Sequence, residues 1–204
     1  MACAWLAAAE EEPASLPVDS RLWEQVSQLA RSGVASPLTT SVGRLFDAVA
    51  ALCGVRSEVT YEGQAAAELE ALLDPAEADR YPLTLRDDGG APLVLDARET
   101  VRAVVEDLRH GAEAATVAAR FHNTLAESTA EACALAAGRC GTDTVVLSGG
   151  AFQNRRLLQR TRALLEGEGL RVLTPEALPP NDGGIAYGQL AVAAARLVEG
   201  DVRA

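Results

Sequence analysis

Most of the first half of the chain follows a helical pattern, in which apolar residues recur every three or four positions. Gly33 and Gly54 close two of these segments, as glycine commonly does at the C-terminal end of a helix. An acidic, proline-containing connector at Glu10–Asp19 separates the first segment from the second. The pattern therefore predicts four helices, within residues 1–9, 21–33, 35–54 and 64–80.

The pattern changes after residue 80, where short apolar runs alternate with helical segments. LTLR and PLVLD, joined by DDGG, predict a β-hairpin within Tyr81–Asp96 with Gly89 and Gly90 in its turn. Such alternation is typical of an α/β sheet covered by helices, so we predict a helical region over 1–80 and an α/β region over 81–204. The expected elements after the hairpin are helices at 98–108 and 112–137, strands at 144–147 and 171–174, and helices opening at 152–154 and 181–184.

Two glycine pairs in the second region each follow a predicted strand. Ser148-Gly149-Gly150 comes directly after one strand, and Asn181-Asp182-Gly183-Gly184 comes shortly after the other. Glycine lets a backbone approach a ligand without interference from Cβ, and the first peptide N–H groups of a following helix attract anions. We therefore predict one nucleotide site, approached by these two turns from two sides.

Charge and composition exclude several other classes of function. The formal net charge of −11 argues against a nucleic-acid surface, which needs clustered Lys and Arg. No run of 18 apolar residues indicates a membrane span, and the first residues lack the basic segment of a signal peptide. The four cysteines form no CxxC pair, which excludes a zinc ribbon and favours free thiols in a reducing cytoplasm.

Four segments occur in a characteristic order along nearly the whole chain: GRLFDAVAALCG, YEGQAAAELEAL, LSGGAFQN and PPNDGGIAYGQ. In this order they resemble the C-terminal part of the HypF family of hydrogenase-maturation carbamoyltransferases. The family belongs to the actin/hexokinase-like ATPases, whose two lobes enclose a nucleotide. The resemblance therefore implies the distal lobe of such a protein, an α/β fold with a ribonuclease H-like mixed sheet flanked by helices, carrying a helical insertion on its N-terminal side.

The resemblance also implies a reaction. Members of the family use ATP to make carbamoyl-adenylate, hold it beside a divalent metal (Fe or Zn), and transfer the carbamoyl group to the C-terminal cysteine of HypE. The product is the precursor of the cyanide ligand of [NiFe] hydrogenases. HypE as acceptor protein and a complementary N-terminal lobe, in cis or in trans, are therefore the expected partners.

Three residues of the first half match positions that the family uses for the nucleotide. Asp47, in GRLFDAV, matches the aspartate that accepts hydrogen bonds from the ribose hydroxyls, although an exposed helical aspartate is the simpler alternative. Gly63, in YEGQ, matches a glycine that lets the backbone approach the nucleoside. Arg44 matches a position near the phosphate or carbamoyl end, and a salt bridge on the helix surface is an equal alternative.

Four residues of the second half match further family positions. Gly149 and Gly150 match the turn under the ribose and phosphate, and Asn154 matches the amide that contacts the nucleoside. The alternative for Asn154 is a plain helix cap. Asp182, in NDGG, matches the aspartate that binds the metal. His122, in RFHNTLAES, lies in no metal-binding motif and is predicted to be structural.

The chain also departs from the family pattern. A His-x-x-x-His metal motif is expected from the other lobe, yet His110 and His122 are the only two histidines and are twelve positions apart. The acylphosphatase, zinc-finger and adenylating regions have no counterpart in the sequence either. Because one carboxylate cannot complete a transition-metal site, we expect the isolated chain to be incomplete as an enzyme.

Other functions remain open at this stage. The chain is either the distal lobe of a HypF-type carbamoyltransferase or a non-catalytic fragment or binding module that keeps weak nucleotide affinity. More distant alternatives are a tRNA threonylcarbamoyl transferase and an O-carbamoyltransferase that acts on a sugar hydroxyl. The acidic balance and the form of YEGQAAAELE and FQN weigh against the tRNA enzyme.

Overall fold

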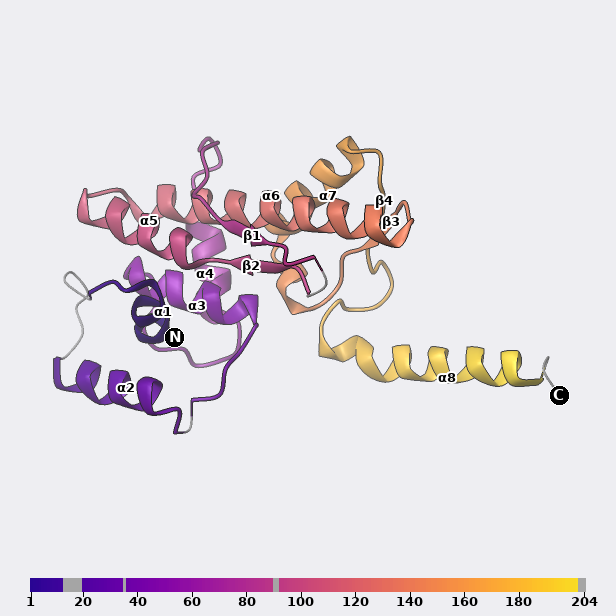
Figure 1. Ribbon diagram of the computed structural model, residues 1–204, viewed down its shortest axis with the longest axis horizontal. Coiled ribbons are helices and arrows are strands. Elements are labelled where there is room, and N and C mark those ends of the chain that lie inside the picture. The colour runs from indigo at the N-terminus through magenta and orange to yellow at the C-terminus, as the bar shows by residue number, and fades with distance from the viewer. Residues whose placement is uncertain (13–19, 35, 90–91, 202–204) are drawn as a thin grey trace.

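The computed structural model describes residues 1–12, 20–34, 36–89 and 92–201 and contains, within them, eight α-helices and four short strands. The long helix α6 (Ala114–Cys140) runs through the body of the molecule. In Figure 1, α5 (Arg98–Arg109) lies beside its first half and α7 (Arg155–Gly167) beside its second half. The fold is therefore a helical body organised around α6, with small sheets at its sides.

The four helices predicted in the first 80 residues are all present. Gly33 and Gly54 follow two of them with φ angles of +71° and +69°, which glycine adopts without a steric penalty. Residues 13–19, which make up most of the predicted connector, lie outside the described residues. The observed helices are α1 (Ala2–Ala9), α2 (Ser20–Ser32), α3 (Val42–Leu52) and α4 (Gln64–Leu72).

The predicted hairpin is formed by β1 (Thr84–Arg86) and β2 (Val94–Asp96), which pair antiparallel with Leu85 opposite Leu95. Gly89 takes the positive φ of +72° that the prediction requires, whereas Gly90 lies outside the described residues. A second pair, β3 (Thr144–Val146) and β4 (Arg171–Leu173), is parallel and is connected by α7. Among the described residues there are thus two separate two-stranded sheets, one antiparallel and one parallel, in place of the single mixed sheet that the resemblance implies.

The main core lies where α1, α3, α4, α5 and the first half of α6 meet. Phe46 and Phe121 pack edge to face there, with ring centroids 5.0 Å apart. Residues 117–126 of α6 are almost all buried, including the polar side chains of His122, Asn123 and Thr124. Because α6 has neighbours on several sides, it lacks the one-sided apolar stripe of a surface helix.

The main core contains residues from both sides of position 80. Leu45 and Leu69 come from the predicted helical region, and Val104 and Phe121 come from the predicted α/β region. A smaller core lies between α6, β3 and α7, around Ala130, Leu147 and Leu165. The boundary at residue 80 stays a prediction, and the two regions share one apolar interior.

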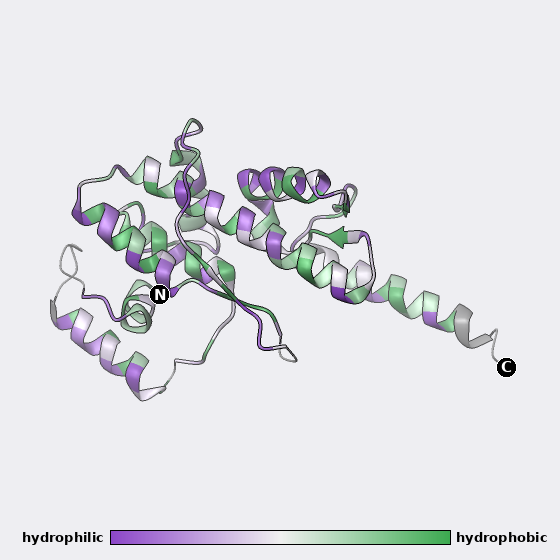
Figure 2. Ribbon diagram, turned by 45° about the horizontal axis from the view of Figure 1, so that its top comes forward, coloured by the Kyte–Doolittle hydropathy of each residue, from purple (hydrophilic) through white to green (hydrophobic). Residues whose placement is uncertain are grey.

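The last helix, α8 (Ile185–Asp201), extends away from the body of the molecule (Figure 1). It follows a short 3₁₀ turn, η2 (Asp182–Gly184). Its apolar residues are widely exposed, and much of its ribbon has the hydrophobic colour in Figure 2. No helix in the described ranges is long and apolar enough to cross a membrane. The exposed fractions are 53% for Ile185, 61% for Tyr187, 68% for Leu190, 52% for Val192 and 74% for Leu197.

We expect the isolated chain to self-associate through this helix, because exposed apolar patches are attracted to one another. Leu190→Lys should weaken self-association about tenfold, because burying a leucine contributes about 1.5–3 kcal/mol. Sedimentation equilibrium over a range of concentrations measures the effect. Gln189→Lys is the matched control, because Gln189 is also exposed and gains the same charge without losing apolar surface. A monodisperse wild-type monomer at high concentration would contradict the prediction.

Candidate functional site

Helix α3 presents Arg44 and Asp47 on one face, because its other face is buried through Leu45, Phe46 and Val49. Arg44 Nη1 donates to Asp47 Oδ2 at 2.9 Å, and the Asp47 side chain is 18% exposed. Arg44 thus forms a salt bridge on the helix surface, which was one of the two alternatives that the sequence allowed for this residue. The bond occupies one carboxylate oxygen, and Oδ1 stays available to hydroxyl donors. The nucleotide roles of both residues stay predictions.

Gly63 lies at the start of α4 with a φ of +83°, a conformation that side-chain-bearing residues rarely adopt. A Cβ atom at this position would meet no atom within 4 Å, so the backbone here borders open space. The preceding loop is fixed by Gln64, whose Oε1 accepts from the Thr60 N–H at 2.8 Å. Gln64 also donates to Glu68 Oε1 at 3.0 Å. The loop that carries Gly63 is therefore held in place by its own helix.

An ion pair supports this loop from behind. Arg56 donates to both oxygens of Glu68, at 2.8 and 2.7 Å, in the two-pronged geometry that suits a guanidinium and a carboxylate. Hydrogen bonds from Arg56 and then from Gln64 hold the pKa of Glu68 below its usual range. The role of Gln64 was not predicted from the sequence, although this residue directly follows the glycine in YEGQ.

The turn after β3 brings the two predicted glycine turns together. Gly149 has a φ of +98°, and its N–H donates to the carbonyl of Pro180 at 2.7 Å. Gly150 opens the short 3₁₀ helix η1 (Gly150–Gln153), and a Cβ there would also meet no atom within 4 Å. Because Pro180 directly precedes Asn181-Asp182, the two turns are neighbours, as predicted from their similarity.

Asn154 caps helix α7, with its Oδ1 accepting from the Leu157 N–H at 2.8 Å. The preceding N–H, of Arg156, donates to Glu70 Oε1 of α4 at 2.9 Å. The expectation that the first N–H groups of this helix face a bound anion is therefore wrong for these two groups. A side-chain amide and a carboxylate from the protein already occupy the positions that an anion would take.

The nitrogen of the Asn154 side-chain amide contacts His122. Asn154 Nδ2 lies 2.8 Å from His122 Nε2, and His122 Nδ1 lies 2.7 Å from the carbonyl of Ala118. A carbonyl can only accept, so Nδ1 carries the proton and Nε2 accepts from Asn154. We call the contacts that join Leu157, Asn154, His122 and Ala118 the Asn154–His122 network. His122 is structural, as predicted, but its link to Asn154 was not expected.

His122 is fully buried, which lowers its pKa below the usual value of 6.5. The bond to Ala118 and the charge of Glu70 act in the opposite direction, and the charge of Arg156 acts with burial. The Phe46 ring packs edge to face on the imidazole, with ring centres 5.2 Å apart. Since Phe46 precedes Asp47, the imidazole connects the helix bearing Asp47 to the turn bearing Asn154.

The predicted nucleotide residues thus form one connected group of contacts. Asp47 pairs with Arg44, which also approaches Glu62, next to Gly63, at 3.6 Å. Asn154 contacts His122, which packs against α3. The glycine turn is joined to Asn154 directly along the chain, through the η1 segment that lies between Gly149 and Asn154. Asp182 is exposed in η2, and no group of three or more His, Cys, Asp or Glu side chains in the described residues could hold a metal ion.

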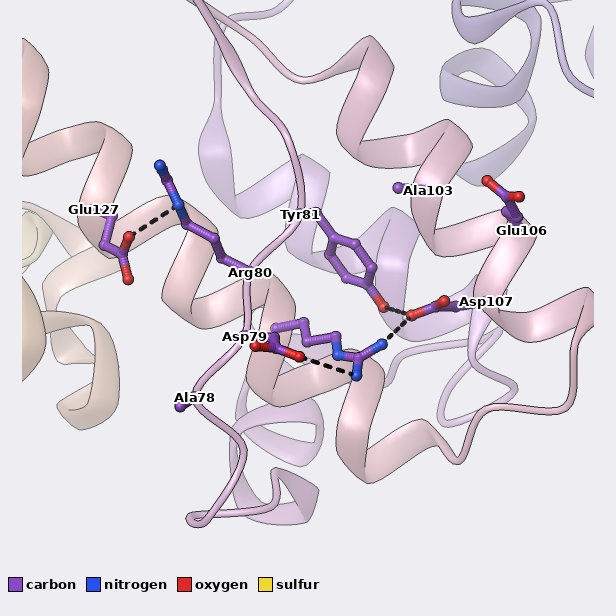
Figure 3. Close-up of a pocket in the computed structure, with 9 residues that line it drawn as sticks. Ala78, Asp79, Arg80, Tyr81, Ala103, Glu106, Asp107 and Glu127 are labelled. Carbon is purple, nitrogen blue, oxygen red and sulfur yellow. Dashed lines mark hydrogen bonds and ion pairs between the residues drawn. The ribbon is translucent and has the colours of Figure 1, made fainter.

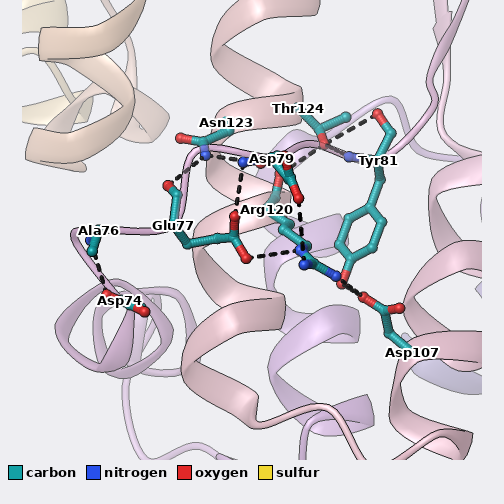
Figure 4. Close-up of polar contacts among 9 residues, drawn as sticks. All are labelled: Asp74, Ala76, Glu77, Asp79, Tyr81, Asp107, Arg120, Asn123 and Thr124. Carbon is teal, nitrogen blue, oxygen red and sulfur yellow. Dashed lines mark hydrogen bonds and ion pairs between the residues drawn. The ribbon is translucent and has the colours of Figure 1, made fainter.

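An open polar hollow lies elsewhere, between α5, α6 and the loop before β1 (Figure 3). Figure 4 shows a network of polar contacts along one side of this hollow, centred on Arg120 and Asp107. Arg120 pairs with Asp107 at 2.8 Å and with Glu77 at 3.0 Å, and the Tyr81 hydroxyl donates to Asp107 at 2.7 Å. Burial, followed by the bond to Asp107, raises the pKa of Tyr81.

This network anchors the loop to the helices. Asn123 Nδ2 donates to the carbonyls of Glu77 and Asp79, at 3.1 and 2.9 Å, and Thr124 Oγ1 accepts from the Tyr81 N–H at 2.8 Å. None of the predicted nucleotide residues lines the hollow. We therefore assign it a structural role and place the candidate site at the turns around Asp47, Gly149 and Asn154.

Comparison with known proteins defines the class. Residues 1–189 match the family described as the carbamoyltransferase Kae1-like domain, second subdomain, so the chain belongs to this family. It is 40% identical to the carbamoyltransferase HypF of Synechocystis sp. over 179 residues, which cover 85% of this chain and 22% of that protein. It is 41% identical to HypF of Rhizobium leguminosarum over 173 residues, 83% of this chain and 21% of that protein.

Solved structures of HypF proteins have the same fold as this chain. Full-length HypF in the phosphate- and nucleotide-bound form superposes with a TM-score of 0.82 at 39% identity, over 88% of this chain and 24% of that one. HypF of T. kodakarensis superposes with a TM-score of 0.73 at 24% identity, over 86% and 23%. The predicted α/β fold class of an actin-like ATPase lobe is confirmed. The chain spans about a fifth to a quarter of the length of these relatives.

Asn154→Ala should lower the free energy of unfolding by about 2 kcal/mol, because it removes a helix cap and leaves the buried His122 Nε2 without a partner. Urea denaturation followed by circular dichroism measures the change. Gln153→Ala, one position earlier and exposed, is the control and should have a small effect. Equal effects of the two substitutions would show that the cap contributes nothing.

Proposed function

We propose that this chain is the nucleotide-holding distal portion of a HypF-type carbamoyltransferase in [NiFe] hydrogenase maturation. In the proposed reaction, the thiolate of the C-terminal cysteine of HypE attacks the carbamoyl carbon of carbamoyl-adenylate. A C–S bond forms, the bond from the carbamoyl carbon to the phosphate oxygen breaks, and AMP leaves. The observation that carries the proposal is the contact between the two glycine turns, in which the Gly149 N–H donates to the Pro180 carbonyl. This contact lies close in the chain to Asn154, which caps α7, and the chain belongs to the carbamoyltransferase family.

In this proposal, each residue of the site has a separate task. Asp47 accepts from the ribose hydroxyls through the oxygen that Arg44 leaves available. A hydroxyl bonded to a carboxylate contributes about 1.5–3 kcal/mol, so this one side chain can anchor the sugar. Gly63, Gly149 and Gly150 border open space where a ligand could meet bare backbone. Asn154 contacts the nucleoside with the amide hydrogen and the lone pair that its internal bonds leave unused.

The metal of the proposed reaction does not fit this chain alone. Asp182 offers one exposed carboxylate, and no group of three or more His, Cys, Asp or Glu side chains among the described residues could hold a metal ion. Transition metals such as Fe and Zn need several protein ligands. Asp182 is therefore only the ligand that this chain would contribute to a metal site shared with another lobe.

A complementary N-terminal lobe is the partner that the proposal requires. The β3–β4 pair supports this requirement, because parallel sheets are normally covered on both faces. Val146 and Leu173 are instead 64% and 45% exposed, and no third strand joins the pair among the described residues. The apolar surface of α8 is exposed as well. Both features suit a chain that spans about a fifth of its relatives.

The alternative proposal is a non-catalytic binding module, and the isolation of Asp182 favours it. Under this alternative, the chain binds a nucleotide without turning over any substrate. The names of the relatives, all HypF, support the hydrogenase branch over the tRNA and antibiotic branches of the superfamily.

Calorimetric titration with ADP and with a non-hydrolysable carbamoyl-adenylate analogue tests the proposal. We expect micromolar dissociation constants, about −8 kcal/mol of binding free energy, for the wild-type chain. Asp47→Asn and Asn154→Ala should each weaken binding at least about tenfold, because each removes hydrogen bonds to the nucleoside.

The control is Asp143→Asn, which removes an exposed carboxylate near β3 that bonds only its neighbour Thr144 among the described side chains. It should leave binding unchanged. Tighter binding of the analogue than of ADP supports the transferase over the plain nucleotide module. No binding at millimolar ADP would overturn the proposal that this chain holds the nucleotide.

A further inference from the structure

We propose that His122 is a positioning residue for nucleoside recognition: its neutral imidazole fixes which edge of the Asn154 amide meets the ligand, and makes nucleotide affinity sensitive to protons. This inference rests on the proposed function and deepens it. His122 itself is buried and touches no ligand in this scheme. Its influence passes entirely through the 2.8 Å contact between Nε2 and Asn154 Nδ2.

The orientation of the Asn154 amide follows from its partners. The Leu157 N–H can only donate, so the amide atom facing it must be the oxygen. The nitrogen therefore faces His122, whose Nε2 must accept because Nδ1 donates to the Ala118 carbonyl. Each donor in the Asn154–His122 network meets one acceptor, and no other assignment of protons satisfies all three contacts.

The fixed amide can still make two hydrogen bonds. One Nδ2 hydrogen and one Oδ1 lone pair remain after the contacts to His122 and Leu157. Adjacent donor and acceptor atoms of an amide match the N7 acceptor and the N6 amino group of adenine. A flipped amide would reverse the order of donor and acceptor and lose this match. Leu157 and His122 together therefore fix the amide edge that adenine would meet, and His122 contributes to the preference for adenine without contacting the base.

Protonation of His122 breaks the network. A proton on Nε2 would face the Asn154 amino group, so that two donors meet. Flipping the amide moves the conflict to the Leu157 N–H, which then faces the same amino group. The charged groups nearest the imidazole are Glu70, from α4, which favours the proton, and Arg156, from α7, which disfavours it. The rings of Phe46 and Phe121, from α3 and α6, offer no compensating charge.

A pair of substitutions separates positioning from packing. His122→Gln places an amide oxygen near the former Nε2, so it can still accept from Asn154. His122→Asn is shorter and can replace only the bond of Nδ1 to Ala118. If His122 matters through its fold contacts alone, the two variants should bind nucleotide equally. If it positions Asn154, only His122→Asn should lose affinity.

The test is ADP titration of the full chain and these variants, with thermal unfolding as a check that each is folded. We expect His122→Asn to weaken ADP binding about tenfold and His122→Gln to stay within about twofold of wild type. In the Asn154→Ala background, His122→Asn should cause no further loss, because the amide it positions is gone. Equal affinities of the two His122 variants, or full additivity with Asn154→Ala, would overturn the inference.

A pH series gives a second readout. The folded pKa of His122 lies below 6.5, so lowering the pH from about 7 to about 5 increasingly protonates it. The ratio of wild-type to His122→Gln affinity for ADP should fall over this range, and taking the ratio cancels the titration of ADP itself. A constant ratio contradicts the proton dependence. Failure of the wild type to bind ADP at any pH would instead contradict the proposed function, so the two failures are distinguishable.

Discussion

The contact between Asn154 and His122 holds the candidate site together. It lies where α3, α6 and α7 meet, and the imidazole is fully buried, so leaving its Nε2 without a hydrogen-bond partner would cost about 1–3 kcal/mol. Through Phe46, the same imidazole packs against the helix that carries Asp47. The positions of the amide and of the carboxylate are therefore coupled, although the two residues are 107 positions apart in the sequence. Any ligand that contacts both meets a preformed spacing.

The described residues position one part of the candidate site and leave another part open, for a physical reason. The turns around Asp47, Gly63 and Asn154 lie on helices that share one core, which holds these turns in place. The metal and the cover over the β3–β4 pair cannot be formed from one side, because a metal needs several ligands and a parallel sheet needs two covered faces. The exposed Asp182 and the exposed α8 both lie after Pro180, where the chain leaves the body of the molecule.

Sequence patterns identified the elements well and their contacts poorly. The predicted hairpin, the strand before Gly149 and the final helix are all present, because glycine turns and apolar periodicity are local signals. The sequence also suggested both a cap and a nucleoside contact for Asn154, and the structure contains the cap. The expected anion position at the start of α7 was wrong because Glu70, distant in sequence, reaches it.

The sequence by itself determined the order of elements and the family, since these depend on local periodicity, turn chemistry and motif, and it proposed which residues a nucleotide would meet. Only the tertiary structure decided that His122 faces Asn154 and that Arg44 pairs with Asp47. The same holds for the hydrogen bond from the Gly149 N–H to the Pro180 carbonyl. Such partners are set by how helices pack, and helix packing brings together side chains whose separation along the chain carries no local signal.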